Sequence, residues 1–367
     1  MAKEKVGAGT LGLALLLGLP GPAKAEPPEV VVSIKPLHSL VASVMGDVGA
    51  PSLLVKGAAS PHSYSLKPSE AKALNRAQLV FWVGEGMETF LVEPLEALSG
   101  QARLIEVADL RGIELLEARE GGAWEAHAHE EHEEHEEHAE AGHHEEGHGH
   151  GEEAHEEHAH EEHAHKEEAH EEHAHEEHEE KGHGHAEHAG HDDHDKNLHL
   201  WLDPHNAEII VKAAVKALGE ADPANAERYQ ANGEATLAEL ETLDSELRKD
   251  LSAIKDAPFV VFHDAYHYFE AHYGLTAVGS ISVDEGRAPG AKRLREVREK
   301  IVDSGARCVF SEPQFEPALV ATVIEGTPAR TAVLDPLGAE LPEGPAAYGQ
   351  IMRGLAASLN KCLAPQS

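Results

Sequence analysis

The segment from Ala126 to Lys196 limits how this chain folds more than any other feature, because it consists almost entirely of histidine, glutamate, alanine and glycine. It holds 23 of the 30 histidines of the chain. From Glu125 to Asp195 there are 28 acidic residues and two lysines, which supply −26 of the formal net charge of −37. Without branched apolar side chains this segment cannot bury enough surface to offset its chain entropy, so we expect a disordered insert.

The composition of the insert also indicates metal binding. Neutral imidazoles are ligands for zinc, copper and nickel, and carboxylates beside them add oxygen donors and negative potential. Acidic disorder alone does not require so many imidazoles. Cations are therefore the expected ligands, whereas the negative charge argues against binding to nucleic acid or to anionic membrane surfaces.

Residues 1–25 have the pattern of a cleavable export signal. Lys3 and Lys5 supply the positive region, Leu11 to Leu19 form a short apolar core, and Ala23-Lys24-Ala25 is a small-residue cleavage site. The apolar core is too short to span a bilayer, and no later segment reaches the required length of about 20 apolar residues. We therefore expect a soluble mature protein in the periplasm, without direct membrane insertion.

The chain has two cysteines, Cys308 and Cys362. In an oxidising compartment such a pair favours a disulfide over two free thiols. The alternative, a soft metal site, would require more ligands than these two.

Outside the insert, short branched-apolar runs alternate with stretches of helical periodicity, which is typical of parallel strands joined by helices. The expected strands are 30–34, 52–55, 79–83, 103–107, 259–262, 277–281, 308–310 and 332–334. The expected helices between them are 37–45, 68–76, 87–98, 204–218, 265–273, 291–303, 317–325 and 346–363. The pattern predicts an α/β protein with two βα lobes of mainly parallel sheet.

One further helix is expected to join the lobes. Asp222-Pro223 is a helix-start signal, and leucine periodicity continues from there until Ala257-Pro258. About 33 helical residues would reach roughly 50 Å, which is longer than a small domain is wide. The expected organisation is an N-terminal lobe over 26–221 that contains the insert 126–196, a linker helix over 222–256 and a C-terminal lobe over 257–367.

Four polar side chains follow strand ends outside the insert. His263 and Asp335 come directly after expected strands, His62 lies in a loop after the strand 52–55, and His199 lies where the insert returns to the core. Ligands of open α/β sheets bind at the carboxyl ends of strands. Three histidines and one carboxylate gathered there would form a nitrogen-rich site that suits zinc.

The segments around these residues resemble, in order, the four metal-site motifs of zinc-specific periplasmic binding proteins, the cluster A-I solute receptors of zinc ABC importers. The resemblance rests on residues 61–69, 198–204, 262–269 and 334–338 and covers essentially the whole mature chain, insert included. It implies two βα lobes joined by a long rigid helix, Zn²⁺ in the interlobe cleft and a membrane permease as partner. It also implies a disulfide in the C-terminal lobe at Cys308 and Cys362.

Carried over position by position, the resemblance implies His62, His199 and His263 as zinc ligands. Pro61 stands where some members have a glutamate ligand, which leaves Asp335 or water as the fourth ligand. His263 stands where manganese-type relatives have glutamate, and imidazole favours zinc over manganese. We expect His267 to lie outside the ligand set, behind it or on a helix surface. Glu312, which also ends a strand, is expected to be a buried acceptor rather than a ligand.

The sequence thus predicts a monomeric periplasmic receptor that captures zinc and delivers it to an ABC importer, with the insert as a low-affinity collector. The alternative is a zinc buffer or storage protein in which the insert is the main device. A zinc hydrolase would need an open water position and a general base, and neither an HExxH helix nor a close carboxylate pair appears. We expect no enzymatic activity.

Overall fold

The structure, a computed structural model, describes residues 26–97, 102–119, 124, 196–282, 289–315 and 317–365. The expected signal peptide and the insert up to Asp195 lie outside these residues.

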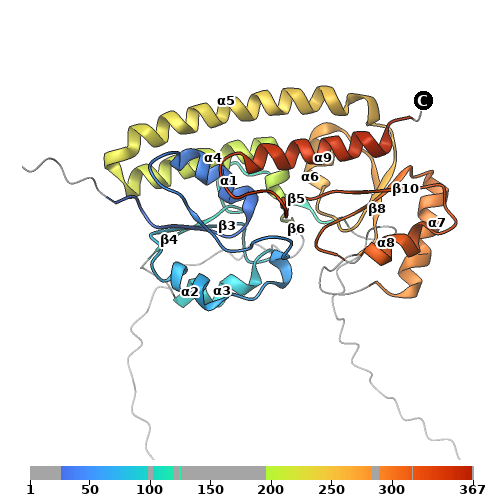
Figure 1. The fold of residues 1–367 in the computed structure, drawn as a ribbon, viewed down its shortest axis with the longest axis horizontal. Helices are drawn as coiled ribbons and strands as arrows, with labels where there is room; N and C mark the ends of the chain where they lie inside the picture. Colours follow the sequence, from blue (N-terminus) through green and yellow to red (C-terminus); the bar gives the residue numbers. More distant parts are fainter. Residues whose placement is uncertain are drawn as a thin grey trace, which may run out of the picture. The chain divides into compact units, whose positions relative to one another are not determined.

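Two four-stranded parallel sheets form the framework of two lobes (Figure 1). In the N-terminal lobe the order is β2 (Ser52–Leu53), β1 (Val30–Val32), β3 (Leu79–Trp82) and β4 (Arg103–Glu106). In the C-terminal lobe it is β10 (Arg330–Val333), β9 (Cys308–Ser311), β7 (Phe259–Val261) and β8 (Ala277–Ser280). The α/β class with two mainly parallel lobes is confirmed.

In each sheet the strand that comes first in the sequence, β1 or β7, has a neighbouring strand on both sides. The next strand along the chain lies on one side of it and the strand after that on the other. Each lobe therefore has a topological switch point at its first strand, which is where open parallel sheets bind ligands.

Helices alternate with the strands as the periodicity predicts. They are α1 (Lys35–Met45), α2 (Pro68–Leu74), α3 (Val92–Ala97), α4 (Pro204–Ala221), α6 (His267–Tyr273), α7 (Ala291–Ser304), α8 (Pro317–Ile324) and α9 (Ala347–Leu363). Capping residues determine where several of these helices begin or end. The Asp203 carboxylate accepts a hydrogen bond from the backbone N–H of His205 and caps α4, whose first residue is Pro204. Gly274, with φ of 69°, ends α6 in the left-handed conformation.

The long linker helix is present. Its α-helical part is α5 (Ala226–Leu251), and 3₁₀ turns at Pro223–Asn225 and Ser252–Ile254 extend it at both ends. The helix-start signal at Asp222-Pro223 led us to expect that the Asp222 side chain would cap this helix, but it makes no capping hydrogen bond. Its carboxylate instead accepts hydrogen bonds from Asn225 Nδ2 at 2.7 Å and from the Tyr229 hydroxyl at 2.9 Å.

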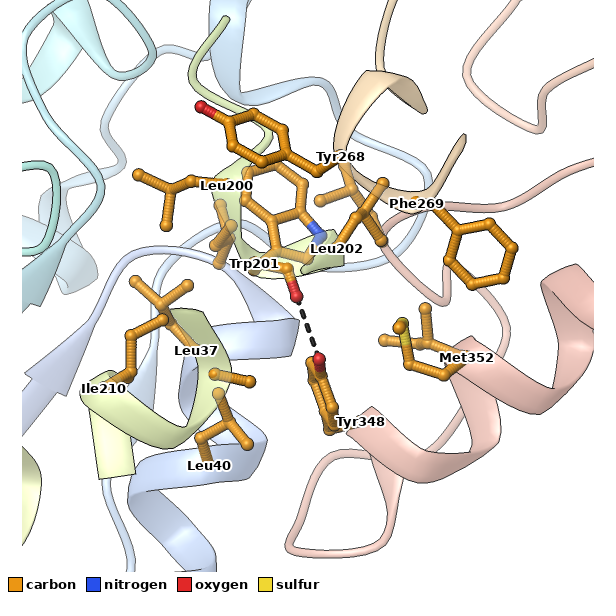
Figure 2. Packing of buried hydrophobic residues seen from close by; sticks show 14 of the residues in the cluster. Leu37, Leu40, Leu200, Trp201, Leu202, Ile210, Tyr268, Phe269, Tyr348 and Met352 are labelled. Carbon is orange, nitrogen blue, oxygen red and sulfur yellow. Dashed lines mark hydrogen bonds between the residues drawn. The ribbon is translucent and has the colours of Figure 1, made fainter. Parts of the chain in front are cut away.

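One cluster of buried apolar side chains runs through both lobes. The last helix, α9, packs against α1 of the N-terminal lobe and lies beside α5, as Figure 1 shows. Figure 2 shows part of this cluster, with Leu37 and Leu40 of α1 close to Ile210 of α4, and Trp201 between Leu200 and Leu202 of the same chain segment. Tyr348 of α9 donates a hydrogen bond to the Trp201 carbonyl at 2.9 Å.

Polar contacts add to the connection between the two lobes. The Lys35 ammonium at the start of α1 donates to the carbonyls of Gly338, Ala339 and Leu341 in the segment after β10. The Trp201 indole N–H donates to the Pro336 carbonyl at 3.1 Å. Lys35 and Trp201, which precede the linker helix, therefore bind backbone carbonyls that follow β10 in the C-terminal lobe.

A short antiparallel pair, which the sequence analysis did not predict, joins the two ends of the insert. β5 (Leu116–Glu117) pairs with β6 (Lys196–Asn197), with Leu116 opposite Asn197 and Glu117 opposite Lys196. An ion pair between the Lys196 ammonium and the Glu117 carboxylate spans the same two strands. The points where the folded chain leaves for the insert and returns from it are therefore adjacent.

The two cysteines form a disulfide. Cys308 on β9 is bonded to Cys362 on α9, with their Cα atoms 6.2 Å apart. This is the pairing that the sequence analysis expected. None of the helices that the structure describes is long and apolar enough to cross a membrane.

Candidate metal centre

His62, His199 and His263 come together, each offering one ring nitrogen within 4.8 Å of the others. Nε2 of His199 lies 3.4 Å from Nε2 of His62 and 3.1 Å from Nε2 of His263. Three nitrogens at about 2.0–2.1 Å from a tetrahedral zinc ion would be separated by about 3.3 Å. These two separations are close to that value, and the third pair, His62 and His263, lies within 4.8 Å, so the three nitrogens are near enough to share one ion.

The three histidines come from different parts of the fold. His62 lies in a 3₁₀ turn (Pro61–Ser63) after β2, and Ser60 accepts a hydrogen bond from its backbone N–H at 3.2 Å. His199 follows β6, and His263 follows β7, the first strand of the C-terminal sheet. His199 and His263 are 8% and 5% exposed, whereas His62 is only half-buried. The group thus draws nitrogen atoms from both lobes, and His62 is the most exposed of the three histidines.

The Glu312 carboxylate contacts Nδ1 of His263, the ring nitrogen that does not face the other two histidines. His263 Nδ1 lies 2.7 Å from Glu312 Oε1, and Glu312 is 3% exposed. The pairing of β7 with β9 explains why His263 and Glu312 are neighbours. Phe259 pairs with Cys308, and His263 and Glu312 each come four residues later, just after the strands end. A carboxylate at Nδ1 favours the tautomer that leaves Nε2 free for a metal and raises the basicity of the ring. Glu312 is thus the buried acceptor that the sequence predicts, and its partner is His263.

Asn197 holds His199 in a similar way. Its side-chain oxygen lies 3.0 Å from His199 Nδ1 and accepts a second hydrogen bond from the His199 backbone N–H, also at 3.0 Å. Asn197 was not among the site residues expected from the sequence. The available signal was its position two residues before His199, since side chains two apart on an extended segment share a face.

Asp335 and His267 are not part of this three-histidine group among the residues that the structure describes. The Asp335 carboxylate accepts hydrogen bonds from the backbone N–H groups of Leu337, Gly338 and Ala339, at 3.2, 2.8 and 2.6 Å. His267 begins α6, and burial, together with the positive charge of Arg119, lowers its pKa. The Asp335 carboxylate therefore stabilises the loop that follows it by binding three backbone N–H groups.

Solved structures share the fold. A crystal structure of ZnuA matches with a TM-score of 0.64 and covers 92% of this chain and 100% of that chain at 24% identity. The periplasmic zinc binding protein TroA from Treponema pallidum matches with a TM-score of 0.65 and the same two coverages, at 16% identity. At such identities the likeness shows the fold alone.

Relatives by sequence match over almost their whole length. The high-affinity zinc uptake system protein ZnuA of Brucella abortus (strain 2308) is 49% identical over 354 residues, which are 96% of this chain and 97% of that protein. The protein of the same name from Paracoccus denitrificans (strain Pd 1222) is 40% identical over 356 residues, 96% of this chain and 98% of that protein.

Two parallel sheets, a long linker helix and three converging imidazoles define a solute-binding receptor for a metal ion. Residues 30–362 match the family described as "Zinc-uptake complex component A periplasmic". The chain belongs to this family, ZnuA.

Proposed function

We propose that this chain is the zinc receptor of an ABC importer and that it binds one zinc ion through Nε2 of His62, His199 and His263. The convergence of these three nitrogens from both lobes is the observation that carries the proposal. The Brucella and Paracoccus relatives named as high-affinity zinc uptake proteins support it. Neutral nitrogen donors favour zinc over harder ions such as manganese or magnesium. Delivery would be to a membrane permease.

The fourth zinc ligand is Asp335 or water. Asp335 lies outside the group of three nitrogens, and its carboxylate already accepts backbone hydrogen bonds within its loop, so its binding to the ion would require the loop to move. Water needs no such rearrangement. We therefore expect Asp335→Ala to weaken zinc binding less than the loss of any of the three histidines.

The ligand set is tested by replacing each histidine with alanine in the full mature chain and titrating zinc against a competing chelator. Each replacement should weaken the tightest site by more than the roughly 10–100-fold that loss of an outer-shell partner costs. His205→Ala is the matched control, because His205 lies near His199 in sequence but is exposed and outside the group. Unchanged tight binding in His263→Ala would overturn the assignment.

The rest of the proposed function follows from this receptor role. We propose that the mature protein starts at Glu26, acts in the periplasm as a monomer and binds no nucleic acid. We also propose that it has no enzymatic activity. Glu312, the buried carboxylate beside the site, supports this because it is occupied with His263 and so is not poised as a general base for a metal-bound water.

We propose that the insert collects zinc at weak, exchangeable sites. Deleting 126–195 leaves β5 and β6 in place, so the three-histidine site should keep its affinity while total zinc stoichiometry falls by several ions. Equilibrium competition with a chelator, before and after the deletion, measures both quantities. A large loss of tight affinity would mean that the insert supplies ligands to the site. Loss of nearly all bound zinc would favour the zinc buffer.

A further inference from the structure

The two chain segments that flank the insert are bound to the part of the C-terminal lobe that carries His263. Asn197 of β6 donates a side-chain hydrogen bond to the carbonyl of Asp264, the residue after His263. The Tyr268 hydroxyl of α6 donates to the Asn197 carbonyl at 2.6 Å and accepts from the Leu116 backbone N–H of β5 at 2.9 Å. Both strands at the base of the insert thus contact the segment 264–268.

An arginine beside β5 strengthens this connection. The Arg119 guanidinium donates three hydrogen bonds to the Asp264 carboxylate, two from Nε and one from Nη2, and two to that of Glu270 in α6. It also stacks on Trp124, with its central carbon 3.5 Å from the ring centroid. Glu270 is only 4% exposed, so this charge cluster is largely removed from water. Bidentate arginine–carboxylate pairs of this kind hold two segments in a defined geometry.

Asn197 connects the strands β5 and β6, which flank the insert, to the three-histidine site. Its side-chain oxygen accepts from His199 Nδ1, and its side-chain nitrogen donates to the Asp264 carbonyl. An amide offers an acceptor and a donor at fixed positions, so one side chain links the ring of His199 to the backbone beside His263. His199 Nε2 then faces Nε2 of His263 at 3.1 Å.

We propose that Asn197 is a positioning residue for the zinc site, and that it makes the base of the insert part of the machinery that orients the ligands. Asn197 keeps the proton of His199 on Nδ1, so that Nε2 presents its lone pair to the metal. The inference rests on the proposed function, in which His199 is a zinc ligand. The segments that flank the insert, with β5 and β6, would then shape the tight site, while the insert itself collects zinc.

Two variants separate the acceptor role from simple structural support. Asn197→Ala removes both the acceptor for His199 and the donor to Asp264, and should weaken the tight site by roughly 10–100-fold. Asn197→Asp keeps an acceptor for His199 but places an oxygen against the Asp264 carbonyl. If orientation of His199 is what matters, the aspartate variant should bind zinc more tightly than the alanine variant, though less tightly than the native protein.

Asn206→Ala is the matched control. Asn206 is also fully buried and makes three hydrogen bonds near the base of the insert, two to the Glu114 backbone and one to the Leu200 carbonyl. It touches none of the three histidines in these contacts. Asn206→Ala should therefore lower folding stability about as much as Asn197→Ala while leaving tight zinc affinity within about threefold.

The experiment is zinc competition against a chelator in the full mature chain, with urea unfolding of the metal-free variants in parallel. Native affinity in Asn197→Ala would overturn the inference. So would an aspartate variant that binds no better than the alanine variant, or an Asn206→Ala variant that loses as much affinity as Asn197→Ala. His199→Ala is included to separate the two proposals: unchanged affinity there would overturn the ligand assignment itself.

Discussion

At the scale of single residues, Glu88 is a carboxyl group that the fold makes sensitive to pH. It is fully buried and accepts hydrogen bonds from the backbone N–H groups of Val83 and Gly84, at 2.8 and 3.1 Å. Burial outweighs these bonds and raises the pKa of Glu88 to about 7. The folded pKa lies above the unfolded value of 4.5, so between these values the folded state keeps a proton that the unfolded state has lost. Glu88 therefore makes the protein less stable as pH rises from about 4.5 to about 7, and the loss is complete above that.

Glu88→Gln should therefore raise the free energy of unfolding by up to about 3 kcal/mol at about pH 8.5, and by much less at about pH 5. Glutamine keeps an oxygen for the two backbone N–H groups and carries no charge. Urea unfolding at the two pH values measures the effect. Glu85→Gln, in the same loop but exposed, should show no such pH dependence. Equal effects of Glu88→Gln at both pH values would contradict the prediction.

The Glu312 carboxylate should matter for zinc affinity because it holds His263 at Nδ1. Glu312→Gln keeps the shape of the side chain but removes the charge that makes the imidazole more basic, so zinc binding should weaken by roughly tenfold or more. Chelator competition measures this change. Glu299→Gln removes the same charge from an exposed position on α7, outside the three-histidine group, and should leave affinity unchanged. A Glu312→Gln variant with native affinity would show that the ring needs no charged partner.

The three histidines that come together were expected from the sequence, but their partners were not. Positions after apolar strands made His62 and His263 candidates, and the motif resemblance completed the set with His199. Glu312 was expected to be buried, but its contact with His263 depends on the register of β7 against β9, which spacing along the chain does not encode. The hydrogen bonds of Asn197 depend on packing between lobes in the same way.

At the scale of elements, the disulfide fixes α9 to the sheet of the C-terminal lobe. It joins Cys308 of β9 to Cys362 near the end of α9. Replacing both cysteines with serine should lower the free energy of unfolding by about 2–4 kcal/mol, because the unfolded chain gains freedom. A reductant should lower the urea midpoint of the native protein towards that of the double variant and leave the double variant unchanged. A reductant effect on both would point to another cause.

The sequence pattern predicted some elements and not others. Apolar runs and helical periodicity located the strands of both sheets and most of the helices, because those patterns repeat over several residues. β5 and β6 each include a charged residue, and neither lies in an apolar run, so the sequence does not mark them as strands. The packing of α9 on α1 and α5 was also missed, since an amphipathic helix shows which face is buried but not against which lobe.

At the scale of the whole molecule, the shared apolar cluster should make the two lobes unfold together. This cluster includes Phe81 of β3, Phe310 of β9 and Tyr348 of α9, and α9 packs against helices that precede the C-terminal sheet in sequence. Amide hydrogen exchange in increasing urea should therefore converge on one opening free energy for β3 and β9. Opening of β9 at a clearly lower free energy, with β3 still protected, would show that the lobes are independent units.

Because β5 pairs with β6, the intervening segment starts and ends at neighbouring points of the fold. The entropy cost of joining two such points grows only with the logarithm of the length between them, by about 0.6 kcal/mol for each doubling. The number of repeats such as Glu156–His160 and Glu161–His165 can thus change with little effect on the lobes. The capacity of the segment between β5 and β6 can therefore vary without disturbing the fold that brings His62, His199 and His263 together.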